Sequence, residues 1–247
     1  MSESLATAAG LLFLVHLAGA APPLLASWSH RGLHFFVSVA AGMFLGAIFL
    51  HLLPELAARG AGADGHAHPS LLPWIAALAG LVLLFFVERI VLARAEGAGD
   101  PHALVWTSSY LGLSLHSFAT GLGFAPVAGD AALAWPIVAA MAVHKAGESF
   151  SLATVMRLAE VPRRRAALLL VLYSASTPAG LLLGSWLALG AGSLLAPVLT
   201  GLACGTFLYV AVGDLLPEVF HGGGRLSGVV GLLLGIGAAA AGVTVLH

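Results

Sequence analysis

The sequence predicts an all-α integral membrane protein, and three observations lead to this fold class. Sixty per cent of the residues are hydrophobic, only 9% are charged and the mean hydropathy is +1.00, which lies far outside the range of soluble domains. Long apolar runs recur along the 247 residues, near the roughly 20 residues that a helix needs to cross a hydrocarbon core of about 30 Å. Short turn-forming stretches separate them. We expect one transmembrane domain over residues 1–247.

Eight apolar segments can be drawn in chain order. They cover residues 5–27, 33–57, 71–93, 103–125, 131–159, 165–188, 193–218 and 225–246. The first could be mistaken for a signal peptide, but the residues before it include Glu3 and no Lys or Arg, so we interpret it as a retained helix. The glycine-rich connection from 59 to 69 carries His66 and His68, which could form a weak metal collector or a solvated loop.

The arginines predict the orientation of these segments. With the N-terminus outside and eight crossings, only Arg59 falls on the outer side. The inner connections and their flanks hold the other eight: Arg31, Arg89, Arg94, Arg157, Arg163, Arg164, Arg165 and Arg225. Because arginine accumulates on the cytoplasmic side of membrane proteins, both termini should lie outside the cytoplasm.

An internal repeat links the second and seventh segments. Residues 41–55 align without gaps to residues 204–218, and both stretches end in Leu-Leu-Pro-Glu. Segments an odd number apart cross the membrane in opposite directions, which is typical of inverted repeats in transporters. We therefore expect a 3+2+3 arrangement, in which helices 1–3 and 6–8 repeat around central helices 4 and 5.

Polar residues gather on the two central segments. Residues four apart share a helix face, so His116 lies beside Thr120, and His144 beside Glu148. Two imidazoles, a carboxylate and a hydroxyl would suit Zn²⁺ and other first-row divalent ions better than Ca²⁺ or Mg²⁺. Lys145 would add a positive charge beside Glu148.

Structural roles are the alternative for the same residues. A lone membrane histidine is often a hydrogen-bonded packing residue, and Lys145 and Glu148 could form a plain ion pair. However, a charged side chain at the centre of a membrane helix costs about 2.5–3.5 kcal/mol on insertion scales. Two such charges beside two histidines therefore favour a functional site.

These motifs resemble the ZIP (Zrt/Irt-like) metal transporter family along all eight segments. The matching motifs are His116-Ser117 with Gly121-Leu122-Gly123, His144-Lys145 with Phe150-Ser151-Leu152, and the paired Leu-Leu-Pro-Glu endings. The resemblance implies eight helices with inverted repeats, outside termini, and influx of divalent metal through a site between helices 4 and 5.

Carried over to this sequence, the resemblance implies that His116, His144 and Glu148 ligate the metal. Many family members have an acidic residue where this chain has Thr120, which becomes a weaker candidate ligand. The positions of a second metal site in some members are Ser117, Lys145 and Thr177 here. The lysine ammonium could take the place of that second cation, so we predict a single-metal centre.

Further polar residues are candidates for the transport path. His51 and Asp214 are equivalent in the repeat, as are Glu55 and Glu218. Each pair could form relay sites on opposite sides of the membrane or interfacial helix ends in contact with water. His16 in the first segment is interpreted as a packing histidine.

We therefore predict a transporter, not an enzyme, that moves divalent transition metal into the cytoplasm by alternating access. Zn²⁺ is the favoured ion, with Fe²⁺, Mn²⁺ and Cd²⁺ as the other candidates, and the metal is substrate, with no cofactor expected. The expected partners are the metal and the lipid bilayer, with a second copy of the chain in a homodimer, and no nucleic acid. We predict a bacterial inner (plasma) membrane.

Two other functions stay open at this point. An intramembrane zinc-dependent hydrolase could use the same histidines and Glu148 to activate water, although the sequence contains neither His-Glu-x-x-His nor Gly-x-Ser-x-Gly. A proton-coupled carrier of organic solutes would bind no divalent metal. The single Cys204 excludes an intramolecular disulfide.

Overall fold

A computed structural model describes residues 3–60, 70–92, 101–126, 128, 131–187, 195–221 and 225–246. These residues form helices and short connections, with no strand among them. The helices are α1 (Glu3–Leu25), α2 (His30–Ala47), η1 (Ile48–Leu52), α3 (Leu53–Gly60), α4 (Leu72–Phe86), η2 (Val87–Leu92), α6 (Pro101–Phe124), α7 (Ala131–Leu158), α8 (Arg163–Ser174), α9 (Ser176–Trp186), α10 (Leu195–Tyr209), η3 (Val210–Leu215), α11 (Leu216–His221) and α12 (Arg225–Leu246). Each of the eight predicted apolar segments is helical over most of its length.

Five helices within the described residues are long and apolar enough to cross a membrane. They span Glu3–Leu25, His30–Ala58, Leu72–Ile90, Arg163–Trp186 and Pro197–Phe220. Large apolar side chains also point outward from the bundle, such as Leu14 at 61% exposure, Leu78 at 63% and Leu233 at 61%. Such a surface is favourable in lipid and unfavourable in water. The chain is therefore an all-α membrane protein.

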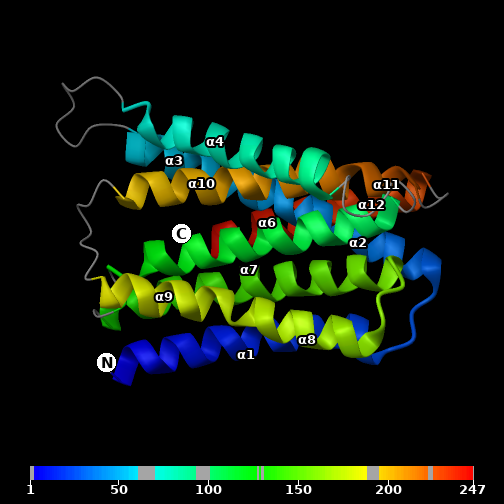
Figure 1. Cartoon of the computed structure of the whole chain (residues 1–247), viewed down its shortest axis with the longest axis horizontal. Coiled ribbons are helices and arrows are strands. Elements are labelled where there is room, and N and C mark those ends of the chain that lie inside the picture. The colour runs from blue at the N-terminus through cyan, green and yellow to red at the C-terminus, as the bar shows by residue number, and fades with distance from the viewer. Residues whose placement is uncertain are drawn as a thin grey trace.

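The helices form one bundle of roughly parallel rods (Figure 1). Helices α6 and α7 run through its middle, with α1, α8 and α9 at one edge and α4 at the other. Helix α1 begins and α12 ends at the same end of the bundle. The two helices that carry the predicted site pack against helices from both halves of the chain, α6 against α9 and α10 and α7 against α1 and α2.

The two copies of the sequence repeat pack in matching ways. Helix α2 packs along α12, while α10 packs along α4. A Cβ at Gly42 of α2 would overlap the carbonyl oxygen of Leu232 in α12. A Cβ at the equivalent Gly205 of α10 would overlap the carbonyl oxygen of Ala77 in α4. Glycine therefore allows the same close helix approach in both copies.

Proline interrupts three of the rods. Turns η1 and η3 are π-helical, and each ends at the first leucine of a Leu-Leu-Pro-Glu sequence, at equivalent places in the repeat. Proline has no N–H and its ring crowds the carbonyl four residues earlier, so local rearrangement is expected before Pro54 and Pro217. The predicted sixth segment is two helices, because α8 ends at Ser174, four residues before Pro178.

Candidate metal centre

Helices α6 and α7 bring the predicted ligands together. Both helices are regular across the polar residues, so His116 and Thr120 share one face of α6, and His144 and Glu148 share one face of α7. Helix α6 also packs against α9 and α10, and α7 packs against α1 and α2. The cluster therefore lies in the interior of the bundle.

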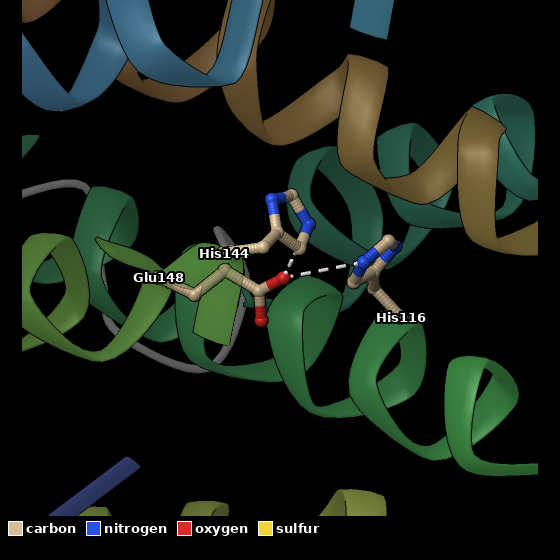
Figure 2. A group of neighbouring side chains, drawn as sticks. All are labelled: His116, His144 and Glu148. Carbon is tan, nitrogen blue, oxygen red and sulfur yellow. Dashed lines mark ion pairs between the residues drawn. The ribbon is translucent and has the colours of Figure 1, made fainter. Parts of the chain in front are cut away.

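Three potential metal ligands converge (Figure 2). The Oε1 atom of Glu148 lies 2.9 Å from Nε2 of His144 and 3.3 Å from Nε2 of His116. One ligand atom from each residue lies within 4.8 Å of the other two. A tetrahedral zinc ion with bonds of about 2.0–2.1 Å has ligand atoms about 3.3–3.4 Å apart, so small adjustments would admit an ion.

A backbone carbonyl of α10 fixes the ring of His116. Its Nδ1 lies 2.9 Å from the carbonyl oxygen of Ala203. Because a carbonyl can only accept, Nδ1 carries a hydrogen and Nε2 of the neutral ring keeps its lone pair for a ligand. The ring of Phe207 stacks on His116 with centroids 4.4 Å apart, which holds the imidazole in this orientation.

Glu148 is the hub of the cluster. Lys145 Nζ donates to its Oε1 and Oε2 at 2.8 and 3.0 Å. The hydroxyls of Ser117 and Tyr173 donate to Oε2 at 2.9 and 2.7 Å. Lys145 also donates to Ser117 Oγ at 3.2 Å. All four side chains are fully buried, so the charge of Glu148 is compensated entirely by neighbouring groups.

Two hydroxyls that the sequence suggested occupy different positions. Thr120 Oγ1 lies 3.4 Å from His116 Nε2, but it donates its hydrogen to the carbonyl of His116 at 2.7 Å. It faces the cluster while bound to its own helix. Thr177 is fully buried, and no hydrogen-bond partner reaches its hydroxyl among the described residues. Its backbone carbonyl lies against Gly121 of α6.

The residues assigned to the transport path lie apart from this cluster. His51 Nε2 is 3.9 Å from Glu55 Oε2, and both side chains are partly exposed. The equivalent Asp214 is only 2% exposed. Glu218 Oε1 lies 3.6 Å from Nδ1 of His34, which the sequence analysis did not single out. Their path roles stay predictions, and His66 and His68 lie outside the described residues.

The structure places residues around the metal centre that the sequence analysis missed. Tyr173 could have been found as a hydroxyl in an apolar segment, because a buried hydroxyl needs a partner. Ala203 and Phe207 gave no chemical signal. His16, interpreted as a packing residue, is fully buried, lies 2.7 Å by Nδ1 from the carbonyl of Leu12, and meets Tyr173 edge to face.

Taken together, the cluster can hold a divalent cation. Two imidazole nitrogens and a carboxylate oxygen form one face of a coordination sphere. The side chain of His144 is 26% exposed, whereas those of His116 and Glu148 are almost fully buried. Of the three candidate ligands, His144 is therefore the least buried.

The sequence is similar to known zinc transporters. The sequence matches the family described as ZIP zinc transporter over residues 2–109 and 102–242. It is 28% identical to zinc transporter ZIP1 of Takifugu rubripes, covering 98% of this chain and 97% of that protein. It is 31% identical to zinc transporter ZIP9 of Micropogonias undulatus, covering 68% of this chain.

The chain spans 59% of the length of that ZIP9 protein. It is 29% identical to zinc transporter ZIP1 of Homo sapiens over 72% of this chain and 68% of that protein. All three relatives are named as transporters and none as an enzyme. The family match covers most of the residues, including both helices of the metal centre. The chain therefore belongs to the ZIP zinc transporter family.

Proposed function

We propose that this protein carries a divalent transition metal, Zn²⁺ before Fe²⁺, Mn²⁺ or Cd²⁺, across a membrane through one site between α6 and α7. The observation that carries the proposal is the convergence of His116, His144 and Glu148 in the middle of a membrane bundle. Ionisable side chains are costly in lipid, so their retention favours use as ligands. The metal is the cargo of the site, and no cofactor is proposed.

The same geometry argues against a zinc hydrolase. A hydrolase of this kind needs a carboxylate free to accept a proton from the attacking water. Glu148 instead receives hydrogen bonds from Lys145, Ser117 and Tyr173, and both histidines approach its Oε1. With its oxygens so occupied, Glu148 suits the roles of ligand and ion-pair partner better than that of a general base.

Alternating access between two inverted repeats is the proposed mechanism. We propose eight crossings in a 3+2+3 arrangement within one domain of residues 1–247. Its support is that corresponding helices of the two repeats have corresponding packing partners. Helices α1 and α7 pack together as α9 and α6 do, and α2 and α12 pack together as α10 and α4 do. Rocking of the outer helices against α6 and α7 would open the site to each side in turn.

We further propose that the termini lie outside the cytoplasm and that metal moves inward. The arginine distribution supports this orientation. The relatives reported above come from eukaryotes, so they give no support to the prediction of a bacterial inner membrane. That location, like the homodimer, stays a prediction.

Lys145 is proposed to take the place of a second cation. Its ammonium lies within 3.2 Å of Glu148 and of Ser117, two of the groups that could otherwise bind a metal there. A second divalent ion beside this fixed charge would be repelled. A single-metal centre follows.

Uptake of radioactive zinc into vesicles containing the purified protein tests the proposal. The wild type should take up zinc faster than empty vesicles, and the double variant His144→Ala, Glu148→Gln should lose most of this uptake. The matched control is Thr154→Val, which removes a hydroxyl that donates to the carbonyl of Phe150 in the same helix. Undiminished uptake by the double variant would contradict the proposal.

A further inference from the structure

The two oxygens of the Glu148 carboxylate have different surroundings. Its Oε1 faces Nε2 of His116 and of His144, whereas the other oxygen points away from both rings (Figure 2). Oε2 accepts hydrogen bonds from the hydroxyls of Tyr173 and Ser117, at 2.7 and 2.9 Å. Helix α7 carries this carboxylate, while α8 and α6 supply the two hydroxyls that fix its orientation.

Only Oε1 has a lone pair left for a metal. Each oxygen of a carboxylate offers about two positions for hydrogen bonds or metal ions. The hydroxyls of Tyr173 and Ser117 occupy both positions of Oε2. Lys145 Nζ lies 2.8 Å from Oε1 and 3.0 Å from Oε2, so its ammonium occupies one position of Oε1. The position that remains on Oε1 faces the two histidine rings.

Tyr173 is held against the carboxylate by its neighbours. The residue is fully buried, and its ring meets that of His16 edge to face with centroids 5.2 Å apart. The ring of Tyr110 lies beside it as well, with centroids 6.5 Å apart. In a close-packed interior such a ring has little room to turn. Moving the hydroxyl away from Oε2 would also leave a buried polar group unpaired, so the hydrogen bond to Glu148 is a fixed feature of the centre.

The number of oxygens that a carboxylate supplies affects which ion fits best. A zinc ion in a protein is almost always four-coordinate and is satisfied by a single carboxylate oxygen. Larger divalent ions take more ligands at longer distances, and like calcium they often bind both oxygens of one carboxylate. Cadmium is larger than zinc and is bound by carboxylates in this two-oxygen manner. A carboxylate restricted to one oxygen therefore favours zinc over cadmium.

We propose that Tyr173, together with Ser117, restricts Glu148 to one metal-binding oxygen and so makes the centre select Zn²⁺ over the larger Cd²⁺. Tyr173 is a positioning residue, because it acts on the ion through Glu148. Hydrogen-bonding partners of metal ligands tune metal sites in this way. This inference rests on the proposed function of the centre, and it adds a determinant of ion selectivity to that function.

The ratio of zinc to cadmium affinity tests the inference. Calorimetric titration of each ion into purified protein gives this ratio for the wild type and for Tyr173→Phe, which removes only the hydroxyl. The variant should shift the ratio towards cadmium by roughly tenfold, the size of effect expected when a partner of a metal ligand is lost. The matched control Tyr110→Phe makes the same change at the neighbouring ring and should keep the wild-type ratio.

Ser117→Ala removes the other hydroxyl that donates to Oε2. It should shift the ratio in the same direction as Tyr173→Phe, and it serves as the test if that variant does not fold.

Infrared difference spectroscopy gives a second readout that a change in stability alone would not move. The two stretching bands of a carboxylate lie far apart when one oxygen binds a metal and close together when both do. Zinc added to the wild type should give widely separated bands, and cadmium added to Tyr173→Phe should give closely spaced bands. An unchanged affinity ratio in both variants, or closely spaced bands in the zinc-loaded wild type, overturns this inference alone. No zinc binding by the wild type overturns the proposed function and the inference with it.

Discussion

Helices α6 and α7 place polar residues at the same spacing but differ in electrostatic character. Each begins its polar stretch with a histidine and places further polar residues one and four positions later: His116, Ser117 and Thr120 on α6, and His144, Lys145 and Glu148 on α7. Helix α6 contributes only groups that can be neutral, whereas α7 contributes an anion and a cation. Helix α7 therefore supplies the charged groups of the centre, while α6 supplies a fixed candidate ligand and a hydroxyl.

The largest expected effect on zinc binding comes from removing the negative charge of Glu148 on α7. Glu148→Gln should weaken zinc binding by on the order of 100-fold or more, because it deletes a ligand. It also leaves the ammonium of Lys145 buried without its partner, which should lower the free energy of unfolding by about 3–5 kcal/mol. Calorimetry and thermal unfolding measure the two effects.

The control for this change is the double variant Glu148→Gln, Lys145→Met. It removes both charges, so stability should recover towards the wild type while zinc binding stays weak. Zinc affinity unaffected by Glu148→Gln would mean that α7 does not supply the charge of the centre.

Reversing the cation of α7 should change the number of ions bound. In Lys145→Asp, a carboxylate replaces the ammonium that contacts Glu148 and Ser117. Zinc stoichiometry should rise from one to two per chain, measured by calorimetry and by metal analysis of the purified protein. Unchanged stoichiometry together with unchanged transport would exclude Lys145 as a substitute for a second metal.

Acid should weaken zinc uptake, because both helices contribute a histidine to the centre. A protonated imidazole has no lone pair for a metal, so we expect zinc uptake to fall as the pH is lowered and the candidate ligand histidines bind protons. The residual uptake of His144→Ala should depend less on pH, and an equally steep dependence in that variant would point to other titrating groups.

The smallest effects on zinc binding should come from replacing Thr120 on α6. Thr120→Val should weaken zinc binding by less than about threefold, because Oγ1 already bonds to the carbonyl of His116. Thr154→Val is the matched control on α7. Thr120→Asp would give α6 a carboxylate at the position that Glu148 has on α7, and should tighten zinc binding by about tenfold. Loss of affinity in Thr120→Asp would mean that position 120 does not face the ion.

Much of this centre could be predicted from the sequence, because helical spacing alone assigns residues 116 and 120, or 144 and 148, to one face. The convergence of several hydrogen bonds on Glu148 could not be predicted, because Tyr173 reaches this carboxylate from a distant segment. The Ala203 carbonyl that orients His116 is a backbone group with no residue-specific signal. Such contacts depend on how the helices pack.

The repeat also predicted more of the scaffold than of the chemistry. Equivalent glycines and equivalent π-helical turns recur in both copies, because backbone packing follows the shared residues. The equivalent His51 and Asp214 differ, as the first is exposed beside Glu55 and the second is buried beside Ser108. The partner of Asp214 comes from α6, which lies outside the repeat, so an alignment of the two copies does not reveal it.

X-ray absorption spectroscopy at the zinc edge tests the metal centre most directly. Protein loaded with one equivalent of zinc should have two imidazole nitrogens and oxygen ligands at about 2.0–2.2 Å, and no sulfur. His144→Ala should lose one imidazole contribution, while His16→Ala, at a buried ring outside the centre, should keep both. A wild-type spectrum without imidazole, or one with a sulfur ligand from Cys204, would contradict the assignment of His116, His144 and Glu148.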